Sequence, residues 1–277
     1  RRGEMVISQL INSYSGFFPD KKEMYLFLEE IFKKDISYFY AHQDQIVEDD
    51  KAKLLLEYAK RRIKKEPVAY ILGKAYFYGN EFIVDRNVLI PRPDTEVLVE
   101  QVISESANFE KPNILDLACG SGCIGISIAK KLKESTVVLS DVSQDCINIT
   151  SINIRHNNVE NNTKVVKSNL FSDIQEKFDI IVSNPPYIPY HEYISLDKQV
   201  ADYEPELALL AGEEGTEFYE IISKEAKNYL NKDGWVMFEV GYNQSKRVED
   251  ILKKQGYSDI TINADIQGIH RVVRAKF

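Results

Sequence analysis

The fold is decided by the stretch Ile114-Leu115-Asp116-Leu117-Ala118-Cys119-Gly120-Ser121-Gly122. Its apolar beginning predicts a buried strand, and its small residues predict a tight loop that a ligand can approach closely. The apolar residues from Ile124 to Leu132 then predict a helix, whose first free N–H groups face the loop. A strand, a glycine-containing loop and a helix in this order are typical of nucleotide-binding α/β domains.

Further along the chain, apolar strand segments alternate with helical ones. This alternation predicts an α/β fold with a doubly wound, mostly parallel, Rossmann-like sheet. The last two strands have no helix between them and therefore predict an antiparallel hairpin at one edge. The expected strands are 114–117, 136–140, 164–167, 179–183, 234–240, 258–262 and 269–275, and the expected helices are 124–132, 143–156, 216–230 and 244–255.

The chain before this domain has a different pattern. Apolar residues at helical spacing predict four or five short helices within residues 1–73; Pro19-Asp20 can open one, and Pro67 should close another or start a new turn. The turn signal Gly79-Asn80 predicts a β-hairpin, which we interpret as a linker over residues 74–93. We therefore expect a helical domain over residues 1–73, this linker, and an α/β domain over residues 94–277. Because no catalytic constellation appears in the helical domain, we expect it to dock the substrate, which leaves catalysis to the α/β domain.

Composition narrows the class of protein. The 277 residues carry a net charge of −8, which argues against a large, sequence-independent grip on nucleic acid. The basic run 60–65 is best interpreted as a solvated helix face. No apolar run is long enough for a membrane helix and no signal peptide is evident, so we expect a cytoplasmic protein. The three cysteines are expected to be reduced thiols, and no second ligand pair supports a metal site.

Polar or small residues mark the ends of three predicted strands. The loop 118–122 follows the first strand, Asp141 ends the second, and Asn184 follows the fourth. Ligands of open α/β sheets bind at the carboxyl ends of strands, where the strand order reverses. A carboxylate such as Asp141 can accept hydrogen bonds from both ribose hydroxyls. The residues 120–125 also match the G-x-G-x-x-G pattern, so a pyridine-nucleotide dehydrogenase is an alternative at this point.

The tetrapeptide Asn184-Pro185-Pro186-Tyr187 indicates what the site acts on. Tandem prolines cannot continue a central strand, so the chain must leave the sheet in a stiff loop. An amide, two rigid carbonyls and a ring can hold a flat, NH₂-bearing group. The competing interpretation is a simple Pro-Pro turn. Upstream, Arg92 and Asp94 either line the same site or form a local ion pair, with Asp94 or Thr95 capping the next helix.

These motifs, taken together, resemble amino-methyltransferases that act on planar nitrogen. Asn184-Pro185-Pro186-Tyr187 and the loop 116–122 leave the substrate open, because adenine methyltransferases share them. Stretches over nearly the whole chain, among them 67–73, 88–96, 204–209, 239–244 and 265–273, resemble the HemK-type release factor glutamine methyltransferases.

The resemblance implies N5-methylation of the glutamine in the Gly-Gly-Gln motif of bacterial class-one peptide chain release factors. It implies S-adenosyl-L-methionine as the methyl donor and S-adenosyl-L-homocysteine as the product. In this interpretation the oxygen of Asn184 and the carbonyl of Pro185 accept the two amide protons, Tyr187 packs on the glutamine, and Pro186 and Arg92 contact the substrate. The cofactor-binding residues are then Ala118, Cys119, Gly120, Ser121, Gly122, Asp141, Asn169, Leu170 and Asn184. We expect a monomer without stable nucleic acid or membrane partners.

The sequence departs from the family pattern in two places. Ala118 replaces the first glycine of the loop, and its methyl group should be tolerated only if its φ is negative. Asn169 stands where an acidic residue is common, and Leu170 stands where a larger apolar side chain can pack on adenine.

Two rival functions remain from the sequence alone. An adenine N6-methyltransferase acting on DNA or RNA is disfavoured by the acidic charge and by the lack of an evident basic recognition domain. An inactive adaptor that only binds a release factor is disfavoured by the intact tetrapeptide and Asp141.

Overall fold

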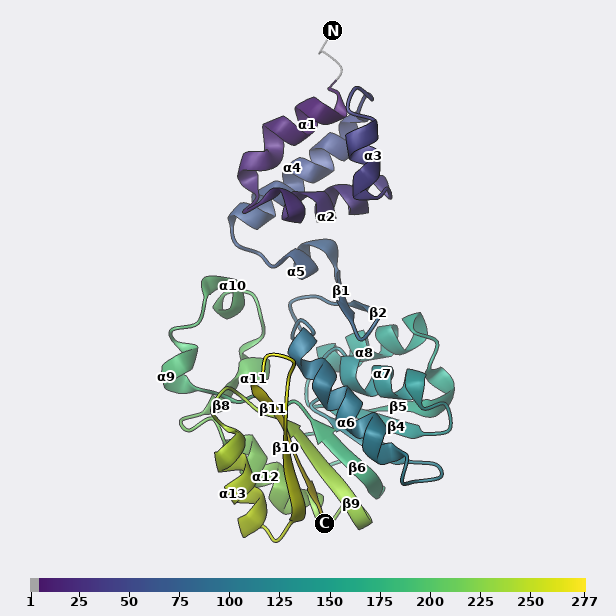
Figure 1. The fold of residues 1–277 in the computed structure, drawn as a ribbon, viewed down its shortest axis with the longest axis vertical. Helices are drawn as coiled ribbons and strands as arrows, with labels where there is room; N and C mark the ends of the chain where they lie inside the picture. Colours follow the sequence, from purple (N-terminus) through teal and green to yellow (C-terminus); the bar gives the residue numbers. More distant parts are fainter. Residues whose placement is uncertain (1–4) are drawn as a thin grey trace. The chain divides into compact units, whose positions relative to one another are not determined.

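The computed structural model describes residues 5–277 and divides after Gly73 into two compact units (Figure 1). Each unit has a hydrophobic core of its own.

The first unit is helical, as the apolar spacing predicts. Asp20 caps the second helix by accepting a 2.8 Å hydrogen bond from the Glu23 N–H, and Pro67 directly precedes the last helix, so both predicted boundaries are confirmed. Leu10, Phe27 and Leu55 are fully buried in its core. Its elements are α1 (Ile7–Tyr14), the 3₁₀ turn η1 (Ser15–Phe17), α2 (Lys21–Phe32), α3 (Ile36–Ala41), α4 (Asp49–Ile63) and α5 (Val68–Leu72).

The arginines of the basic run 60–65 are used inside this unit. Arg61 donates from two nitrogens to Glu66, at 2.9 and 2.8 Å, and also contacts the carbonyl of Tyr70 at 3.2 Å. Arg62 pairs with Glu23 of α2. Since these guanidinium groups are already bound to carboxylates, the run is part of the helical framework.

The second unit is built on a seven-stranded sheet of order β10-β11-β9-β6-β3-β4-β5. Parallel pairing joins β5, β4, β3, β6 and β9, whereas β11 runs antiparallel to both of its neighbours. The predicted edge hairpin is confirmed. The strands are β3 (Asn113–Leu117), β4 (Thr136–Asp141), β5 (Thr163–Lys167), β6 (Phe178–Ser183), β9 (Leu230–Glu239), β10 (Ser258–Ala264) and β11 (His270–Lys276).

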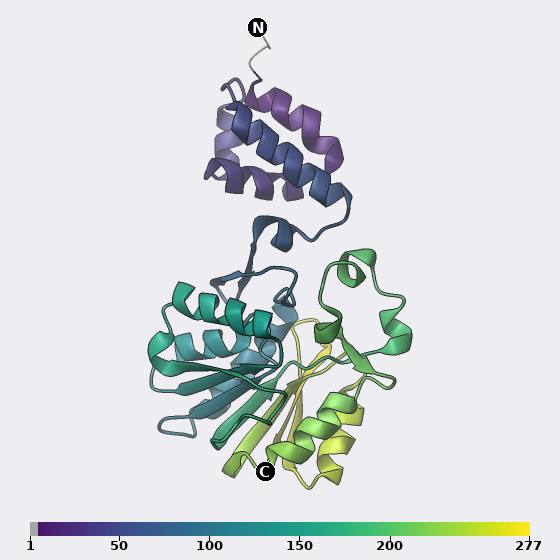
Figure 2. The same ribbon diagram turned by 180° about the vertical axis from the view of Figure 1, so that it is seen from behind.

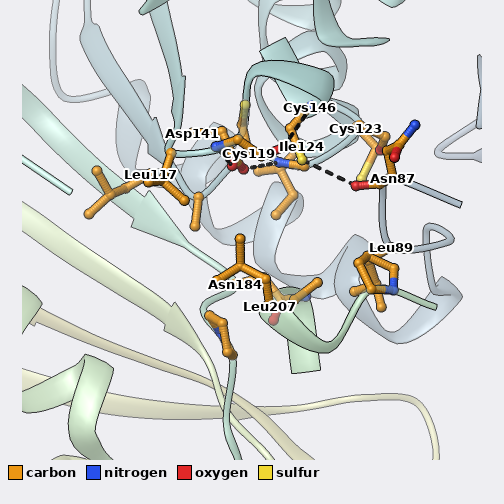
Figure 3. A pocket seen from close by; sticks show the side chains of 18 of the residues that line it. Asn87, Leu89, Leu117, Cys119, Cys123, Ile124, Asp141, Cys146, Asn184 and Leu207 are labelled. Atoms are coloured by element: carbon orange, nitrogen blue, oxygen red, sulfur yellow. Dashed lines mark hydrogen bonds between the residues drawn. The ribbon is translucent and has the colours of Figure 1, made fainter. Parts of the chain in front are cut away.

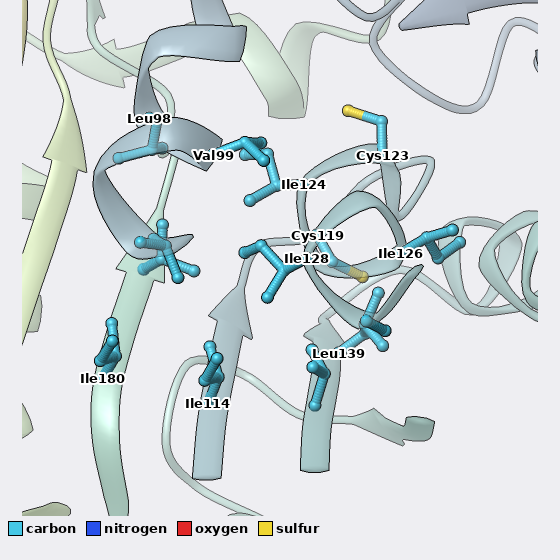
Figure 4. Packing of buried hydrophobic residues seen from close by; sticks show 14 of the residues in the cluster. Leu98, Val99, Ile114, Cys119, Cys123, Ile124, Ile126, Ile128, Leu139 and Ile180 are labelled. Carbon is cyan, nitrogen blue, oxygen red and sulfur yellow. The ribbon is translucent and has the colours of Figure 1, made fainter. Parts of the chain in front are cut away.

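Helices cover both faces of this sheet (Figures 1 and 2). One face packs against α6 (Glu96–Ser106), α7 (Cys123–Lys131) and α8 (Gln144–His156), and the other against α12 (Glu217–Ala226) and α13 (Ser245–Lys254). On the first face, Leu98 of α6 and Ile124 of α7 meet Ile114 and Ile180 of the two central strands (Figure 4). Burial on both sides explains why the central strands β3 and β6 are mostly apolar.

The hairpin of β1 (Lys74–Phe77) and β2 (Asn80–Ile83) packs on this second unit. Asn153 of α8 accepts from the Ile83 N–H at 2.7 Å and donates to the Ile83 carbonyl at 2.9 Å. Phe77 and Phe82 are buried in the core under α6 and α7. The hairpin is therefore fastened to the sheet domain by side-chain hydrogen bonds as well as by apolar packing.

Two details differ from the sequence-based expectations. The helix expected over 216–230 ends at Ala226, and Leu230 already begins β9. The segment after β6 also holds short elements that the apolar pattern does not indicate, because each is too short to show a period. They are β7 (Ile188–Pro189), α9 (Tyr190–Tyr193), α10 (Lys198–Ala201), α11 (Glu206–Leu209) and β8 (Leu210–Gly212); the remaining 3₁₀ turns are η2 (Pro93–Thr95) and η3 (Glu160–Asn162).

Within residues 5–277, no helix has both the length and the apolar character needed to cross a membrane.

Candidate active site

Strand register brings the marked residues together. The order of the strands reverses between β3 and β6, which is where open α/β sheets bind ligands. Pairing aligns one residue of each of four strands in a single row, made of Ser140, Leu117, Ser183 and Phe238. The residues that follow this row are neighbours at the carboxyl edge, and they are Asp141, Ala118, Asn184 and Glu239.

A cavity of about 350 Å³ opens at this edge (Figure 3). Its volume lies within the range of small-molecule sites. It brings together most of the predicted site residues: Arg92, Ala118, Cys119, Gly120, Ser121, Asp141, Asn169, Leu170, Asn184 and Pro186. Three other predicted residues, Gly122, Pro185 and Tyr187, are not among its lining residues.

The two loop glycines have different surroundings. Gly120 has a φ of +55° and open space within 4 Å of the position that a Cβ would take, so a side chain there would enter the cavity. Gly122 has a φ of +79°, and a Cβ there would come within 2.9 Å of the Thr150 side chain. Gly120 therefore leaves room for a ligand, whereas Gly122 lets the helix α7 begin close to its neighbours.

Ala118 corrects one expectation. Its φ is +61°, in the left-handed region, and not negative as its methyl group led us to expect. The turn geometry that a glycine usually serves is thus kept with an alanine, at a cost of about 1–2 kcal/mol. The backbone around it is held by neighbours, since the Cys119 N–H donates to the Ser140 carbonyl at 2.9 Å.

A buried carboxyl supports the loop from below. Asp116 is fully buried, and its Oδ2 accepts the Gly125 N–H of α7 at 2.8 Å. Burial raises the pKa of Asp116 to about 7, against the lowering effect of the Gly125 hydrogen bond and with a smaller raising effect from Asp141. Its Oδ1 has no hydrogen-bond partner among the described residues.

Asp141 is oriented by the backbone. Its Oδ2 accepts the Gly120 N–H at 2.9 Å, and its Oδ1 accepts the Ser143 N–H at 3.0 Å (Figure 3). Each carboxylate oxygen keeps a further lone pair. A rigidly held acceptor beside an open glycine suits the two hydroxyls of a ribose, so this end of the cavity fits the nucleoside part of S-adenosylmethionine.

Residues after β5 form the next wall. Asn169 is exposed and Leu170 is half-buried, and both line the cavity together with Ser168. Leu170 has a φ of +50°, and the Ser168 hydroxyl donates to its carbonyl at 2.7 Å. An apolar side chain beside a polar one fits a flat base with polar edges.

Asn184 follows the end of β6 and lines the same cavity (Figure 3). Its Nδ2 donates to the Thr95 hydroxyl at 3.4 Å. The strand end beneath it is tied to β3, because the Ser183 hydroxyl donates to the Leu117 carbonyl at 2.6 Å. The amide is therefore presented to the cavity from a fixed backbone.

Tyr187 lies on the sheet side of its loop. It packs against the core under α12 and α13, and its carbonyl accepts from the Gln244 side chain at 2.8 Å. Gln244 also accepts the Gly241 N–H at 3.0 Å and so joins this loop to the end of β9. Burial, together with the charge of Glu239, raises the pKa of Tyr187, so the phenol stays neutral.

Arg92 and Asp94 do not pair with each other. Arg92 forms an ion pair with the buried Glu204, and Glu204 also accepts the Ile90 N–H at 3.2 Å. Asp94 instead pairs with Arg271 of β11 at 2.6 Å. Thr95 makes no capping bond to α6, so the expectation of a local ion pair with a cap is wrong. Arg92 remains a lining residue, and its partner fastens the segment before α11 over the cavity.

All three cysteines line the cavity as free, buried thiols. Cys146 donates to the Asn87 carbonyl at 3.3 Å, and Cys119 contacts the Thr150 hydroxyl (Figure 3). Burial raises the pKa of all three, so they are poor nucleophiles. Across residues 5–277, no three His, Cys, Asp or Glu side chains gather as metal ligands would.

Sequence reasoning missed several residues that complete the site. Glu239, Gln244 and Glu204 lay within the family-like stretches but had no role assigned to them. A signal for Glu239 was present, because once β6 and β9 are placed side by side the residue after Phe238 must adjoin Asn184. No comparable signal marks Glu204, whose place depends on the path of a loop.

Comparisons with known proteins agree with this geometry. Residues 16–73 match the family described as "PrmC N-terminal domain", and residues 93–202 match "Methyltransferase small domain". The release factor glutamine methyltransferase of Clostridium acetobutylicum is 38% identical, over 96% of this chain and 96% of that protein. The protein of the same name from Fusobacterium nucleatum is 43% identical, over 86% of this chain and 67% of that protein.

The fold is also found among solved structures. A methyltransferase from Pyrococcus furiosus matches with a TM-score of 0.53, at 18% identity, over 83% of this chain and 98% of that one. At this level of identity the match shows the shared class I methyltransferase fold.

Proposed function

Since this chain belongs to the release factor glutamine methyltransferase family, we propose that it methylates the side-chain amide nitrogen of the glutamine in the Gly-Gly-Gln motif of bacterial class-one release factors. The observation that carries the proposal is the position of Asn184. Its carboxamide borders the same cavity as the backbone-held Asp141, so the group that would bind the amide and the group that would bind the nucleoside line one space.

The chain's own residues divide the binding of S-adenosylmethionine between them. When bound, this cofactor supplies a methyl group already activated by a sulphonium charge. Asp141 would accept the ribose hydroxyls, Gly120 and Ser121 would let the cofactor approach the loop, and Asn169 with Leu170 would border the adenine. The product is S-adenosylhomocysteine.

At the other end of the cavity the task is to orient a weak nucleophile. A carboxamide nitrogen is poorly nucleophilic because its lone pair is delocalised into the carbonyl. Asn184 Oδ1 and the Pro185 carbonyl would accept its two protons and so fix the direction of the NH₂ group. Tyr187 and Pro186 would shape the surface against which the glutamine side chain packs.

Positioning of this kind is sufficient for a large rate enhancement. Well-oriented reactants can lower a barrier by about 7–11 kcal/mol. No strong base is required, because an amide that has gained a methyl group on nitrogen is very acidic and loses its proton readily. The reaction accordingly depends on hydrogen-bond acceptors that orient the substrate amide and does not depend on a general base.

The test is transfer of a labelled methyl group to purified release factor. We expect incorporation into wild-type release factor and none into a release factor whose Gly-Gly-Gln glutamine is replaced by alanine. An adenine-containing DNA duplex serves as the second substrate. Methylation of the duplex instead of the release factor would replace this proposal with adenine methylation, which the net charge of −8 disfavours.

An inactive adaptor would bind release factor and transfer nothing in the same assay. We further propose that the protein acts as a monomer in the cytoplasm and has no stable nucleic acid partner. The helical unit of residues 1–73 would serve to anchor the release factor, since no catalytic group was found in its sequence.

A further inference from the structure

Glu239 is a buried carboxyl at the active-site edge to which the reaction has so far given no task. Glu239 is the last residue of β9, and only 3% of its surface is exposed. Its Oε2 has no hydrogen-bond partner among the described residues. Burying a carboxyl group that lacks hydrogen-bond partners destabilises the folded protein, so a buried carboxyl at this position calls for an explanation.

Its neighbours supply that reason. The register of β6 and β9 places Glu239 beside Asn184, and Thr95 and Asn184 are close enough to its carboxyl group to favour the ionised form. The Nδ2 of Asn184 also points to the Thr95 hydroxyl, at 3.4 Å. The NH₂ group of Asn184 therefore lies at the Thr95 hydroxyl, and the Asn184 carboxamide adjoins the Glu239 carboxyl.

The chemistry of the two groups fixes this orientation. An ionised carboxylate only accepts hydrogen bonds, so it binds the NH₂ end of a carboxamide and repels the oxygen end. With its NH₂ group occupied, Asn184 has its Oδ1 left for a donor in the cavity. Without the carboxylate, nothing described near Asn184 distinguishes the two ends of the amide.

We propose that Glu239 is a positioning residue for methyl transfer, which holds the Asn184 carboxamide so that its oxygen accepts a proton of the substrate amide. This proposal rests on the proposed function, because it concerns the orientation of the amide that receives the methyl group.

The charge state of Glu239 then matters. Burial raises its pKa to about 7, while Thr95, Arg271 and Asn184 favour the ionised form and Asp94 disfavours it. Tyr187, Tyr219 and Cys123 also face it, from the loop after β6, from α12 and from α7. A protonated Glu239 becomes a donor and can bond to Asn184 Oδ1, which removes that oxygen from the substrate.

The first test compares Glu239→Gln with wild type in single-turnover methyl transfer to release factor. The control is Glu105→Gln, which removes a half-buried carboxylate that is paired with Arg274, outside the cavity. We expect Glu239→Gln to lower the transfer rate at pH 8 about 10-fold, with cofactor affinity and melting temperature close to wild type. We also expect the wild-type rate to fall below pH 7, and this fall to be absent in Glu239→Gln and unchanged in Glu105→Gln.

A second measurement keeps the proposal testable without turnover. The side-chain ¹⁵N–¹H₂ signal of Asn184, assigned by its loss in Asn184→Asp, should shift with a midpoint near pH 7 in wild type and stay constant in Glu239→Gln. An Asn184 signal that does not titrate, or a Glu239→Gln rate equal to that of wild type, overturns the positioning role. A wild-type enzyme that leaves release factor unmethylated overturns the proposed function instead, while the signal of Asn184 still decides the role of Glu239.

Discussion

The nucleoside end and the amide end of the cavity, named for the groups that we propose they bind, are held together by different means. At the nucleoside end, backbone groups do the work, since the N–H groups of Gly120 and Ser143 fix Asp141. At the amide end, side chains do it, since Thr95, Asn184 and Glu239 come from segments far apart in the sequence and meet only in the folded sheet. The first arrangement forms locally from one motif and the next strand, whereas the second requires β6, β9 and η2 to be packed together.

The difference teaches how the two ends should respond to substitution. Backbone-held geometry survives many side-chain changes, so a change at the nucleoside end should mainly reduce cofactor affinity. A side-chain network loses its geometry when one member is removed, so a change at the amide end should mainly reduce the rate of transfer. The predictions below test this division, beginning with the largest effect.

Asn184→Ala should lower the rate of methyl transfer at saturating substrates by about 10²–10³-fold, the range for removing one oriented polar group from a reacting centre. The expected cause is loss of the acceptor that orients the substrate amide. Stopped assays give the rate, and calorimetry should give a cofactor affinity within a few-fold of wild type. The matched control, Asn148→Ala on the exposed face of α8, should behave as wild type. Near-normal turnover in Asn184→Ala would remove the basis of the comparison.

Asp141→Ala should weaken cofactor binding by roughly 10–100-fold, because hydrogen bonds to a charged group contribute about 1.5–3 kcal/mol. The rate at saturating cofactor should stay within a few-fold of wild type. Calorimetric titration with S-adenosylhomocysteine measures the affinity. Asp145→Asn, an exposed carboxylate in the first turn of α8, is the control. Unchanged affinity in Asp141→Ala would contradict its assignment to the nucleoside end.

Asp116 gives the nucleoside end a pH dependence of stability. A carboxyl whose folded pKa is raised to about 7 binds more protons in the folded than in the unfolded state, so its contribution to stability is full below about pH 4 and is lost as the pH rises through 7. The free energy of unfolding of wild type should therefore fall between pH 5 and 8 by about 1–3 kcal/mol more than that of Asp116→Asn. Urea unfolding at each pH measures this slope, with the exposed Asp202→Asn as control. Equal slopes for wild type and Asp116→Asn would show that this carboxyl is ionised without strain.

Ala118→Gly should produce the smallest effect, a gain of up to about 1 kcal/mol in the free energy of unfolding, because glycine adopts a positive φ without a steric cost. Chemical denaturation measures the gain, and cofactor affinity should stay within twofold. Ala129→Gly, in the interior of α7, should destabilise by about 1 kcal/mol or more. If both substitutions destabilise alike, the turn at residue 118 stores no strain.

The difference between local contacts and contacts between distant segments also decides which features of the fold and the site can be predicted from the sequence. The strands, the edge hairpin and the glycine loop follow from local patterns, because burial on both faces makes the central strands β3 and β6 apolar over most of their length. Asp141 and Asn184 could be placed at the cavity because each lies at the end of a recognisable strand. The sign of φ at Ala118 could not be predicted, because the neighbours that impose it come from β4. The partners of Arg92 and Asp94, namely Glu204 and Arg271, are more than a hundred residues away in the chain, and no spacing rule reaches that far.

Every thiol of this chain opens onto one space. The sequence contains three cysteines, and Cys119, Cys123 and Cys146 all border the cavity at the switch point. Burial raises the pKa of all three thiols, so they react slowly with alkylating agents, and a molecule seated in the cavity covers them further. The protein thus keeps all of its cysteines unreactive at the place where we propose that an alkylating cofactor binds.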